Sequence, residues 1–203
     1  DRLFKYFRAL TCLLRDGNST VSSKRLAEIC HVKSAVVRKD FSYFGEFGTR
    51  GVGYDTDNLI ANVRSILKFD REINVAIVGV GNIGSALLEH SSFELEGFKI
   101  IMAFDNDPQK IGKTVGPVMI EDIKSMQERI KSMEIQLVIL AVPEYVATEV
   151  VQLLESTDVK SILSFVPSEL TIPDSIKVTC IDLSVEMARL VYYSFSENEE
   201  IKA

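Results

Sequence analysis

Apolar residues follow two different spacings along the chain, and the change falls near residue 70. Before it, apolar residues recur at helical intervals, as they do in 3–14. After it, they form short continuous runs rich in β-branched residues, such as 75–78 and 135–142. Such runs are typical of strands that are buried on both faces of a parallel sheet. The pattern predicts a helical region followed by an α/β region.

The first 70 residues predict four helices and one hairpin. The expected helices are 3–14, 23–29, 35–44 and 57–69, the last three capped by Ser22, Ser34 and Asp57. A glycine-rich hairpin is expected at 47–54, with Arg50 at its tip. Two helices joined by a tight turn and followed by a hairpin indicate the winged-helix form of the helix-turn-helix.

In a winged-helix domain the helix after the turn enters the major groove of DNA. If Val37 and Phe41 face the core, Arg38 and Lys39 face the duplex. Arg50 at the tip of the wing would reach the minor groove, where the negative potential is strongest. The alternative is a small helical domain with a solvated basic face.

The strand at 75–78 leads into a complete G-x-G-x-x-G, Gly79 to Gly84, and a helix follows. Gly79 permits the turn off the strand, and Gly81 lets a pyrophosphate approach the backbone. Gly84 allows close packing of helix on strand. The free N–H groups at the start of the helix would face the phosphates. This context predicts a dinucleotide site.

A second strand, 99–104, ends in Asp105, which is 21 positions after Gly84. An acid at about this distance binds the ribose 2′-hydroxyl in dinucleotide-binding folds. It would also repel a 2′-phosphate, so NAD(H) is favoured over NADP(H). The alternatives are an α/β turn that binds nothing, or a site for another nucleotide such as CoA.

Strands and helices continue to alternate to the end of the chain. Further strands are expected at 118–120, 135–142, 160–166 and 177–181, and helices at 121–133, 143–155 and 183–195. The alternation predicts a doubly wound parallel sheet, with the cofactor along the carboxyl ends of its strands, near Val142-Pro143 and Pro167. The last helix carries an apolar stripe with no obvious place in such a domain, which favours a dimer.

Net charge differs sharply between the two regions. Residues 1–70 contain 12 Lys/Arg and 8 Asp/Glu, net +4, whereas the remainder contains 11 and 21, net −10. This asymmetry favours two domains with different partners, one spanning 1–70 and the other 71–203.

The chain begins at Asp1 rather than Met, which indicates a trimmed sequence, and no signal pattern or apolar run of membrane-spanning length is present.

Three scattered cysteines, Cys12, Cys30 and Cys180, favour buried thiols in a reducing cytoplasm over disulfides. His31 and His90 have no cysteine or acidic pair at ligand spacing, so a metal site is not expected.

Four motifs, in this order, resemble the Rex family of redox-sensing transcriptional repressors. They are R-K-D-F-S-Y-F-G-E-F-G-T-R-G-V-G-Y at 38–54, V-G-V-G-N-I-G at 78–84, F-D-N-D-P at 104–108 and I-D-L-S at 181–184. The resemblance implies a winged-helix domain, a Rossmann domain and a C-terminal helix swapped between the subunits of a bacterial homodimer. It also implies binding to a palindromic operator, release by NADH and weak competition by NAD+.

The resemblance also implies roles for individual residues. Contacts to DNA would come from Ser34, Arg38, Lys39, Tyr43 and Arg50. The dinucleotide would be held by Gly79, Val80, Gly81, Asn82, Ile83, Gly84, Asp105, Val142, Pro143, Pro167 and Asp182. Arg8 and Asp182 would form the ion pair between domains that reports the state of the nicotinamide, with His90 nearby in the switch.

Two positions depart from the family pattern. His90 occupies a place where the family often has a tyrosine that belongs to the redox switch, so the separation of NADH from NAD+ is left open. We expect a partly exposed histidine at a helix end. The chain also reads Phe165-Val166-Pro167 where the family often reads F-A-P.

Two other function classes remain open from the sequence. An NAD-dependent dehydrogenase would need a substrate domain and an acid–base pair, and the basic N-terminal region suits neither. A CoA- or nucleotide-binding ligase subunit would share the Rossmann domain but would not explain the winged helix. Adding NADH with candidate substrates, and separately with DNA, would distinguish these classes.

Overall fold

The computed structural model describes residues 2–43, 45, 53–67, 71–90, 92–95, 97–167 and 172–200, without the side chains of 92, 95 and 195–200. The chain divides into two compact units, Asp1–Arg71 and Glu72–Ala203. The hairpin predicted at 47–54 lies largely outside the described residues, and so does Arg50 at its tip.

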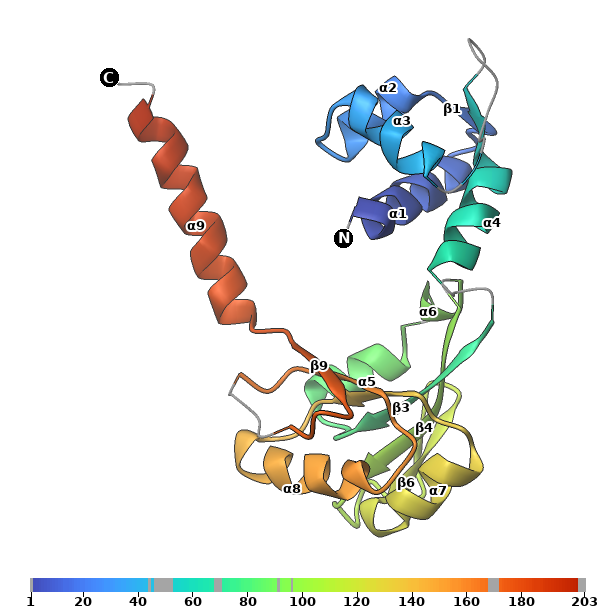
Figure 1. Cartoon of the computed structure of the whole chain (residues 1–203). Coiled ribbons are helices and arrows are strands. Elements are labelled where there is room, and N and C mark those ends of the chain that lie inside the picture. Colours follow the sequence, from blue (N-terminus) through green and yellow to red (C-terminus); the bar gives the residue numbers. More distant parts are fainter. Residues whose placement is uncertain are drawn as a thin grey trace. The chain divides into compact units, whose positions relative to one another are not determined.

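The N-terminal unit contains the four predicted helices and a small sheet. Its helices are α1 (Arg2–Arg15), α2 (Ser23–Ile29), α3 (Ser34–Ser42) and α4 (Thr56–Ile66) (Figure 1). Strands β1 (Thr20–Val21) and β2 (Tyr54–Asp55) pair antiparallel. The sequence did not predict β1, because two residues are too few to show a period.

The caps of α2 and α3 differ from each other. Ser22 caps α2 as predicted, since its hydroxyl oxygen accepts a hydrogen bond from the Arg25 backbone N–H at 3.1 Å. The prediction that Ser34 caps α3 was wrong. Lys33 is the extended N-cap residue and contributes no side-chain hydrogen bond, while Ser34 is already the first helical residue.

The cap of α4 was also assigned to the wrong aspartate. Asp55, rather than Asp57, accepts the hydrogen bond from the Asn58 backbone N–H, at 2.8 Å. Asp55 is the last residue of β2, and its extended backbone is the conformation that an N-cap needs. Asp57 lies within the first turn of the helix.

One apolar core holds the N-terminal unit together. Its fully buried large side chains are Tyr6, Leu10, Leu26, Phe41 and Leu59. The Phe41 ring lies 5.3 Å from the Tyr6 ring and 5.4 Å from the Tyr54 ring, centroid to centroid. Helix α3 is therefore packed against both α1 and β2 through one aromatic side chain.

The C-terminal unit is built on a seven-stranded sheet. Its strands are β3 (Ile73–Val78), β4 (Phe98–Asp105), β5 (Thr114–Val115), β6 (Val118–Asp122), β7 (Leu137–Leu140), β8 (Ser161–Ser164) and β9 (Lys177–Cys180). Its helices are α5 (Asn82–Leu88), α6 (Ser92–Leu95), the 3-10 turn η1 (Ile123–Ser125), α7 (Met126–Ser132), α8 (Glu144–Glu155) and α9 (Leu183–Glu200).

The sheet has the order β5-β6-β4-β3-β7-β8-β9. Every neighbouring pair is parallel except β5 and β6, which form an antiparallel edge that the sequence did not predict. Without β5, the chain order on either side of β3 is that of the doubly wound dinucleotide-binding fold. The doubly wound sheet of the predicted fold class is thereby confirmed.

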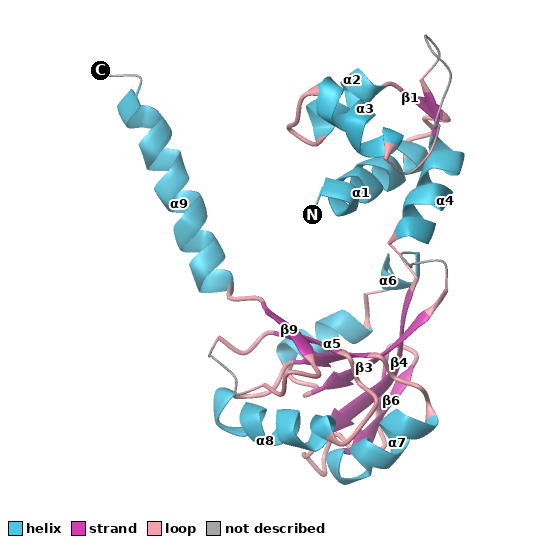
Figure 2. Ribbon diagram, viewed as in Figure 1, coloured by secondary structure: helices cyan, strands magenta, loops and turns pink. Residues whose placement is uncertain are grey.

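Alternate residues of β3 supply two separate cores. Ala76 and Val78 pack with α7 and α8, whereas Val75 and Ile77 pack on the opposite face with Leu88 of α5. Figure 2 shows α5 on one side of the sheet and α7 and α8 on the other. Burial on both faces explains why the strand is continuously apolar.

The segment predicted as the helix 121–133 is divided. Strand β6 continues to Asp122, whose carboxylate accepts a hydrogen bond from the Lys124 backbone N–H at 2.9 Å. The 3-10 turn follows, and α7 begins only at Met126.

The expectation of buried thiols holds for Cys30 alone, because Cys12 and Cys180 are exposed.

Helix α9 is longer than predicted and leaves its apolar side chains exposed. The exposed apolar and aromatic residues on it are Leu183, Val185, Met187, Leu190, Val191, Tyr192 and Tyr193. None of the helices in the described part of the chain combines the length and apolar character that crossing a membrane requires.

Candidate functional site

Two of the three motif glycines are required by the packing of the protein itself. Gly79 has φ +94, and a Cβ there would collide with the carbonyl oxygen of Ala141. A Cβ at Gly84 would collide with the carbonyl oxygen of Gly79. These contacts place the first turn of α5 directly against the turn after β3, as the motif predicts.

Gly81 is different, because the protein leaves space around it. An ideal Cβ at Gly81 would meet no heavy atom within 4 Å, and the residue has no positive φ. Neither backbone strain nor internal packing therefore calls for glycine at this position. Close approach of a ligand to the backbone does, which is the role of the second glycine of a dinucleotide-binding motif.

A cavity of about 450 Å³ opens at this end of the sheet. It is lined by Gly79, Gly81, Asp105, Asn106, Asp107, Lys110, Ile123, Ala141, Val142, Pro143, Tyr145, Val146, Glu149, Val150 and Leu153. These residues come from the end of β4, from the segments that follow β3, β4, β6 and β7 and from one face of α8, so the cavity lies at the carboxyl ends of the central strands, where such folds bind ligands.

Asp105 accepts three hydrogen bonds from other groups of the protein. Its Oδ2 atom accepts hydrogen bonds from the Val80 backbone N–H at 2.8 Å and from Lys110 Nζ at 3.0 Å. Its Oδ1 atom accepts one from the Asp107 backbone N–H at 2.9 Å. Burial alone would raise the pKa of this carboxyl, but the hydrogen bonds and the Lys110 charge together hold the pKa below its ordinary value.

Five of the predicted dinucleotide residues line the cavity: Gly79, Gly81, Asp105, Val142 and Pro143. The others, Val80, Asn82, Ile83, Gly84, Pro167 and Asp182, are described but are not part of its lining. Val80 contributes through its hydrogen bond to Asp105 and Gly84 through its contact with Gly79.

Asp182 caps a helix in this structure. Its Oδ1 atom accepts hydrogen bonds from the backbone N–H groups of Ser184 at 2.8 Å and Val185 at 3.2 Å, at the start of α9.

His90 is exposed just after α5, and its ring contacts Phe93 with 5.0 Å between centroids. His90 thus lies at a helix end, as expected.

In the N-terminal unit, α3 presents its basic residues outward. Val37 and Phe41 are buried, whereas Arg38 and Lys39 are exposed, as the winged-helix pattern predicts. Arg38 Nη1 donates a hydrogen bond at 3.3 Å to the hydroxyl of Ser23, the first residue of α2. The side chain of Arg38 therefore lies along the junction between α2 and α3.

The other residues expected to contact DNA have different positions. Ser34 is the partly buried first residue of α3, and Tyr43 follows the helix with a side chain 75% exposed. Arg50 lies outside the described residues. The turn between α2 and α3 passes through His31 with φ +53, a conformation that its sequence did not predict.

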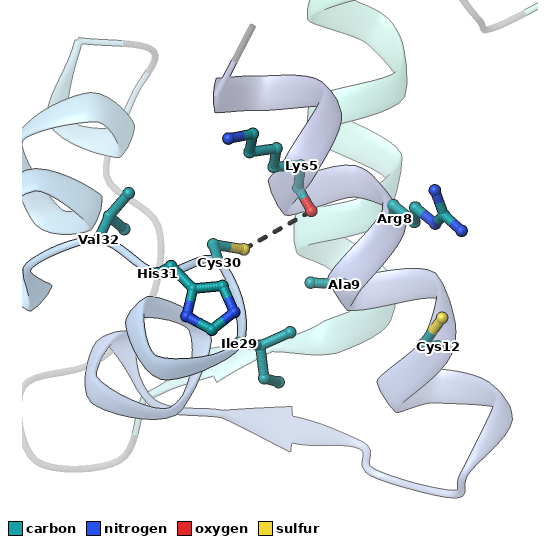
Figure 3. Close-up of a pocket in the computed structure, with 8 residues that line it drawn as sticks. All are labelled: Lys5, Arg8, Ala9, Cys12, Ile29, Cys30, His31 and Val32. Atoms are coloured by element: carbon teal, nitrogen blue, oxygen red, sulfur yellow. Dashed lines mark hydrogen bonds between the residues drawn. The ribbon is translucent and has the colours of Figure 1, made fainter. Parts of the chain in front are cut away.

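Arg8 lies on the exposed side of α1, beside a shallow cavity of about 420 Å³ (Figure 3). The same cavity is also lined by Lys5, Cys12, Ile29 and His31.

The buried thiol of Cys30 donates a hydrogen bond to the Lys5 carbonyl oxygen at 3.6 Å, and burial raises the pKa of that thiol. Cys30 therefore joins the α2–α3 turn to α1 rather than acting as an exposed nucleophile.

Lys110 and the side chains of α8 that line the cavity were not predicted from the sequence. Lys110 follows Asp105 by five residues, and the Asn106-Asp107-Pro108 turn returns it to that carboxylate. On α8, Tyr145 and Glu149 are one helical turn apart, a spacing that shares one helix face. The signal for these residues was the turn sequence and the helical spacing after Pro143.

Two family models match the chain. One, described as a CoA binding domain, covers residues 70–168, and the other, described as "Putative DNA-binding protein N-terminus", covers residues 1–42. The first corresponds to the α/β unit with its glycine motif, and the second to α1, α2 and α3.

Curated relatives match over almost the whole chain. The redox-sensing transcriptional repressor Rex of Chloroflexus aurantiacus is 38% identical over 198 residues, which cover 98% of this chain and 93% of the relative. The protein of the same name from Halalkalibacterium halodurans is 41% identical over 192 residues, covering 95% of this chain and 90% of the relative.

Solved structures of a Rex-family repressor are also similar to this chain. RSP, a Rex-family repressor, was solved in complex with β-NAD+ and operator DNA, and it superposes with a TM-score of 0.85 at 32% identity, covering 99% of this chain and 92% of RSP. RSP in complex with β-NADH gives 0.86 at 31% identity, covering 99% and 94%. With identities of 38% and 41% to these relatives over nearly the full length, and a TM-score of 0.85 to a Rex-family repressor, the chain belongs to the Rex family of redox-sensing transcriptional repressors.

Proposed function

We propose that this protein is a transcriptional repressor that binds operator DNA when NADH is scarce and releases it when NADH binds. One observation carries the proposal: a single chain places exposed Arg38 and Lys39 on a helix of one unit, and the open backbone at Gly81 beside Asp105 in the other. One unit suits DNA and the other a dinucleotide, so the chain has the parts of a DNA switch operated by NADH.

We assign residues 1–70 to operator binding and residues 71–203 to NADH and NAD+. In the first domain, α3 enters the major groove, with Ser34, Arg38, Lys39 and Tyr43 at the duplex and Arg50 in the minor groove. The most direct support is that Val37 and Phe41 are buried while the cations next to them are exposed. A repressor of this kind acts in the cytoplasm.

In the second domain, the backbone around Gly81 receives the pyrophosphate, and Asp105 binds the adenosine ribose. The cavity of about 450 Å³ extends from these residues to apolar side chains of α8, such as Val146 and Leu153, which suits the adenosine half of the cofactor. The nicotinamide half would then lie toward Pro167, Asp182 and His90, which do not line that cavity. Discrimination between redox states belongs there, because the nicotinamide ring is positively charged only when it is oxidised.

The active form is a homodimer joined through α9. Seven apolar or aromatic side chains on that helix are exposed, an arrangement that calls for a protein partner. A second copy supplies one with two-fold symmetry, which fits a palindromic operator with half-sites about 34–36 Å apart, one helical turn. In this dimer α9 is exchanged between subunits.

Arg8 of one subunit pairs with Asp182 of the other in the state that binds DNA. The Asp182 Oδ1 atom caps α9, while Oδ2 has no hydrogen-bond partner among the described residues. A guanidinium at Oδ2 would therefore join α1 of one chain to the start of α9 in the other without disturbing the cap. NADH would favour an arrangement of the dimer in which this pair is broken.

The function classes left open by the sequence are not favoured. The relatives are named as transcriptional repressors, a family of regulators that are not enzymes, which removes support for a dehydrogenase or a ligase subunit. The direct experiment is an electrophoretic shift of operator DNA titrated with NADH and NAD+ side by side. Release at lower NADH than NAD+ supports the proposal, and equal concentrations for release would contradict redox sensing.

A further inference from the structure

The ribose-binding carboxylate at the end of β4 is already largely occupied by the protein. Asp105 is only 7% exposed, and three protein groups donate to it: Val80 and Lys110 to Oδ2, and Asp107 to Oδ1. A carboxylate offers about four acceptor positions, two on each oxygen. One position therefore remains, on Oδ1, although a ribose presents two neighbouring hydroxyl groups.

Lys110 has N–H donors that are left for a second ribose hydroxyl group. Its ammonium carries three N–H donors, of which Asp105 takes one at 3.0 Å. The side chain is 37% exposed and lines the same cavity as Gly81 and Asp105. It is thus available both to the protein and to a ligand in that cavity.

Lys110 also adds a positive charge to a cavity whose other charged side chains, in the part of the chain that the structure describes, are carboxylates. Among the described residues that line the cavity, it is the one cation, beside the carboxylates of Asp105, Asp107 and Glu149. Without Lys110 the charged side chains of this lining would all be carboxylates, and a 2′-phosphate would be strongly repelled. With Lys110 in place, a 2′-phosphate meets an ammonium next to the carboxylate that repels it.

We propose that Lys110 and Asp105 bind the adenosine ribose as a pair, one hydroxyl donating to Asp105 Oδ1 and the other accepting from Lys110 Nζ. The inference rests on the proposed dinucleotide site and adds its specificity-determining residue. Its consequence is that the chain rejects a 2′-phosphate less strongly than Asp105 alone would dictate. Removal of the Lys110 charge should therefore sharpen the preference for the 2′-hydroxyl.

A purely structural role for Lys110 makes a different prediction. The turn after β4 is held by backbone bonds, from Lys110 N–H to the Asp107 carbonyl at 2.9 Å and from Lys113 N–H to the Lys110 carbonyl at 3.0 Å. These bonds do not involve the Lys110 side chain. Replacing that side chain should leave the turn formed, and a structural role would change the binding of every nucleotide by the same factor.

The experiment is calorimetric titration of the full chain with ADP-ribose and with its 2′-phosphate. Both probes lack the nicotinamide, so redox discrimination does not enter the result. Lys110→Gln removes the charge, Lys110→Arg keeps it, and Lys113→Gln removes a charge from the same loop outside the cavity lining. The readout is the ratio of the two dissociation constants, which a general loss of folding would not shift.

We expect Lys110→Gln to weaken both probes and to widen that ratio by about tenfold in favour of ADP-ribose, as loss of one charge-assisted bond implies. Lys110→Arg and Lys113→Gln should keep the ratio of the parent protein. An unchanged ratio in Lys110→Gln would overturn the assignment of Lys110 while leaving NADH sensing in place. Failure of the parent protein to bind ADP-ribose or NADH would overturn the dinucleotide site itself, and the Lys110 inference with it.

Discussion

The Asp40 carboxylate on α3 accepts both hydrogen bonds of the Arg2 guanidinium on α1, Nε to Oδ2 at 2.7 Å and Nη2 to Oδ1 at 2.8 Å. The hydroxyl of buried Tyr6 donates to the same Oδ2 atom at 2.8 Å. Asp40 directly follows Arg38 and Lys39, so these contacts hold the orientation of the helix that carries the proposed DNA-binding cations.

Replacing this carboxylate should make stability less dependent on pH. The hydrogen bonds from Arg2 lower the pKa of Asp40, and the Tyr6 hydroxyl adds to this effect against burial. Because the folded pKa is below the unfolded value of about 3.9, the stabilisation is complete above that value and is lost as pH falls through the folded pKa. Asp40→Asn should destabilise the fold by about 1 kcal/mol at pH 7, since water screens much of the pair.

Urea unfolding of parent and variant at pH 7 and at pH 3 measures this difference. It should shrink at the lower pH, because pH 3 lies below the unfolded pKa of about 3.9 and the unfolded chain then binds a proton at Asp40. Asp16→Asn, a change at an exposed carboxylate, serves as the control. A difference in unfolding free energy that is the same at both pH values would show that the Asp40 charge does not stabilise the fold.

The second prediction concerns Gly81. Gly81→Ala should change the free energy of unfolding by less than about 0.5 kcal/mol, because a Cβ there meets no atom of the protein. The same methyl group would obstruct the approach of a pyrophosphate, so NADH affinity should fall by about tenfold or more. Thermal unfolding and calorimetric titration with NADH measure the two effects.

Gly84→Ala is the matched comparison. Its Cβ would collide with the Gly79 carbonyl oxygen, so this variant should lose about 1–3 kcal/mol of stability. Unchanged NADH affinity in Gly81→Ala would mean that no ligand approaches the glycine turn.

The fold was predictable wherever many residues repeat one pattern. The apolar run at 75–78 indicated a central strand because both of its faces are buried. Strands β1 and β5 were missed since each has only two residues and exists through its partner. The choice of Asp55 over Asp57 as a cap likewise depends on the pairing of β2 with β1, which no local pattern contains.

The candidate site was predictable where residue type alone restricts the chemistry. Gly79, Gly81 and Asp105 could be named because a turn, a close approach and a ribose acceptor each need one kind of residue. Lys110 could not be named in this way, because lysines are common on surfaces and its role depends on the turn that returns it to Asp105. Nor did the sequence indicate that Asp182 caps α9, since that depends on where the helix begins.

The third prediction tests the recognition helix. Lys39→Ala should weaken operator binding by about 1–3 kcal/mol if Lys39 contacts a base, with NADH affinity unchanged. Arg15→Ala removes one positive charge at the end of α1 and should have a smaller effect at the same salt concentration. Fluorescence anisotropy with labelled operator measures these affinities. Full operator affinity in both Lys39→Ala and Arg50→Ala would exclude a winged-helix interface.

The fourth prediction concerns the proposed pair between Arg8 and Asp182 of the partner subunit. Arg8→Ala should lower operator affinity and leave NADH affinity equal or higher, because only the DNA-binding arrangement uses the pair. Lys5→Ala is the control, because it removes an equal charge from a residue of α1 that lines the same cavity as Arg8. Equal operator affinities for these two variants would contradict a specific role for Arg8.

The central claim is that one equilibrium of the dimer links the two binding sites. Linkage requires that operator DNA weaken NADH binding by the same factor by which NADH weakens operator binding. The most direct measurement is titration of the full chain with NADH, with and without saturating operator duplex, at one salt concentration. The account predicts a weaker NADH affinity in the presence of the operator, by a factor equal to that measured in the converse titration. Identical NADH affinities with and without operator would contradict it.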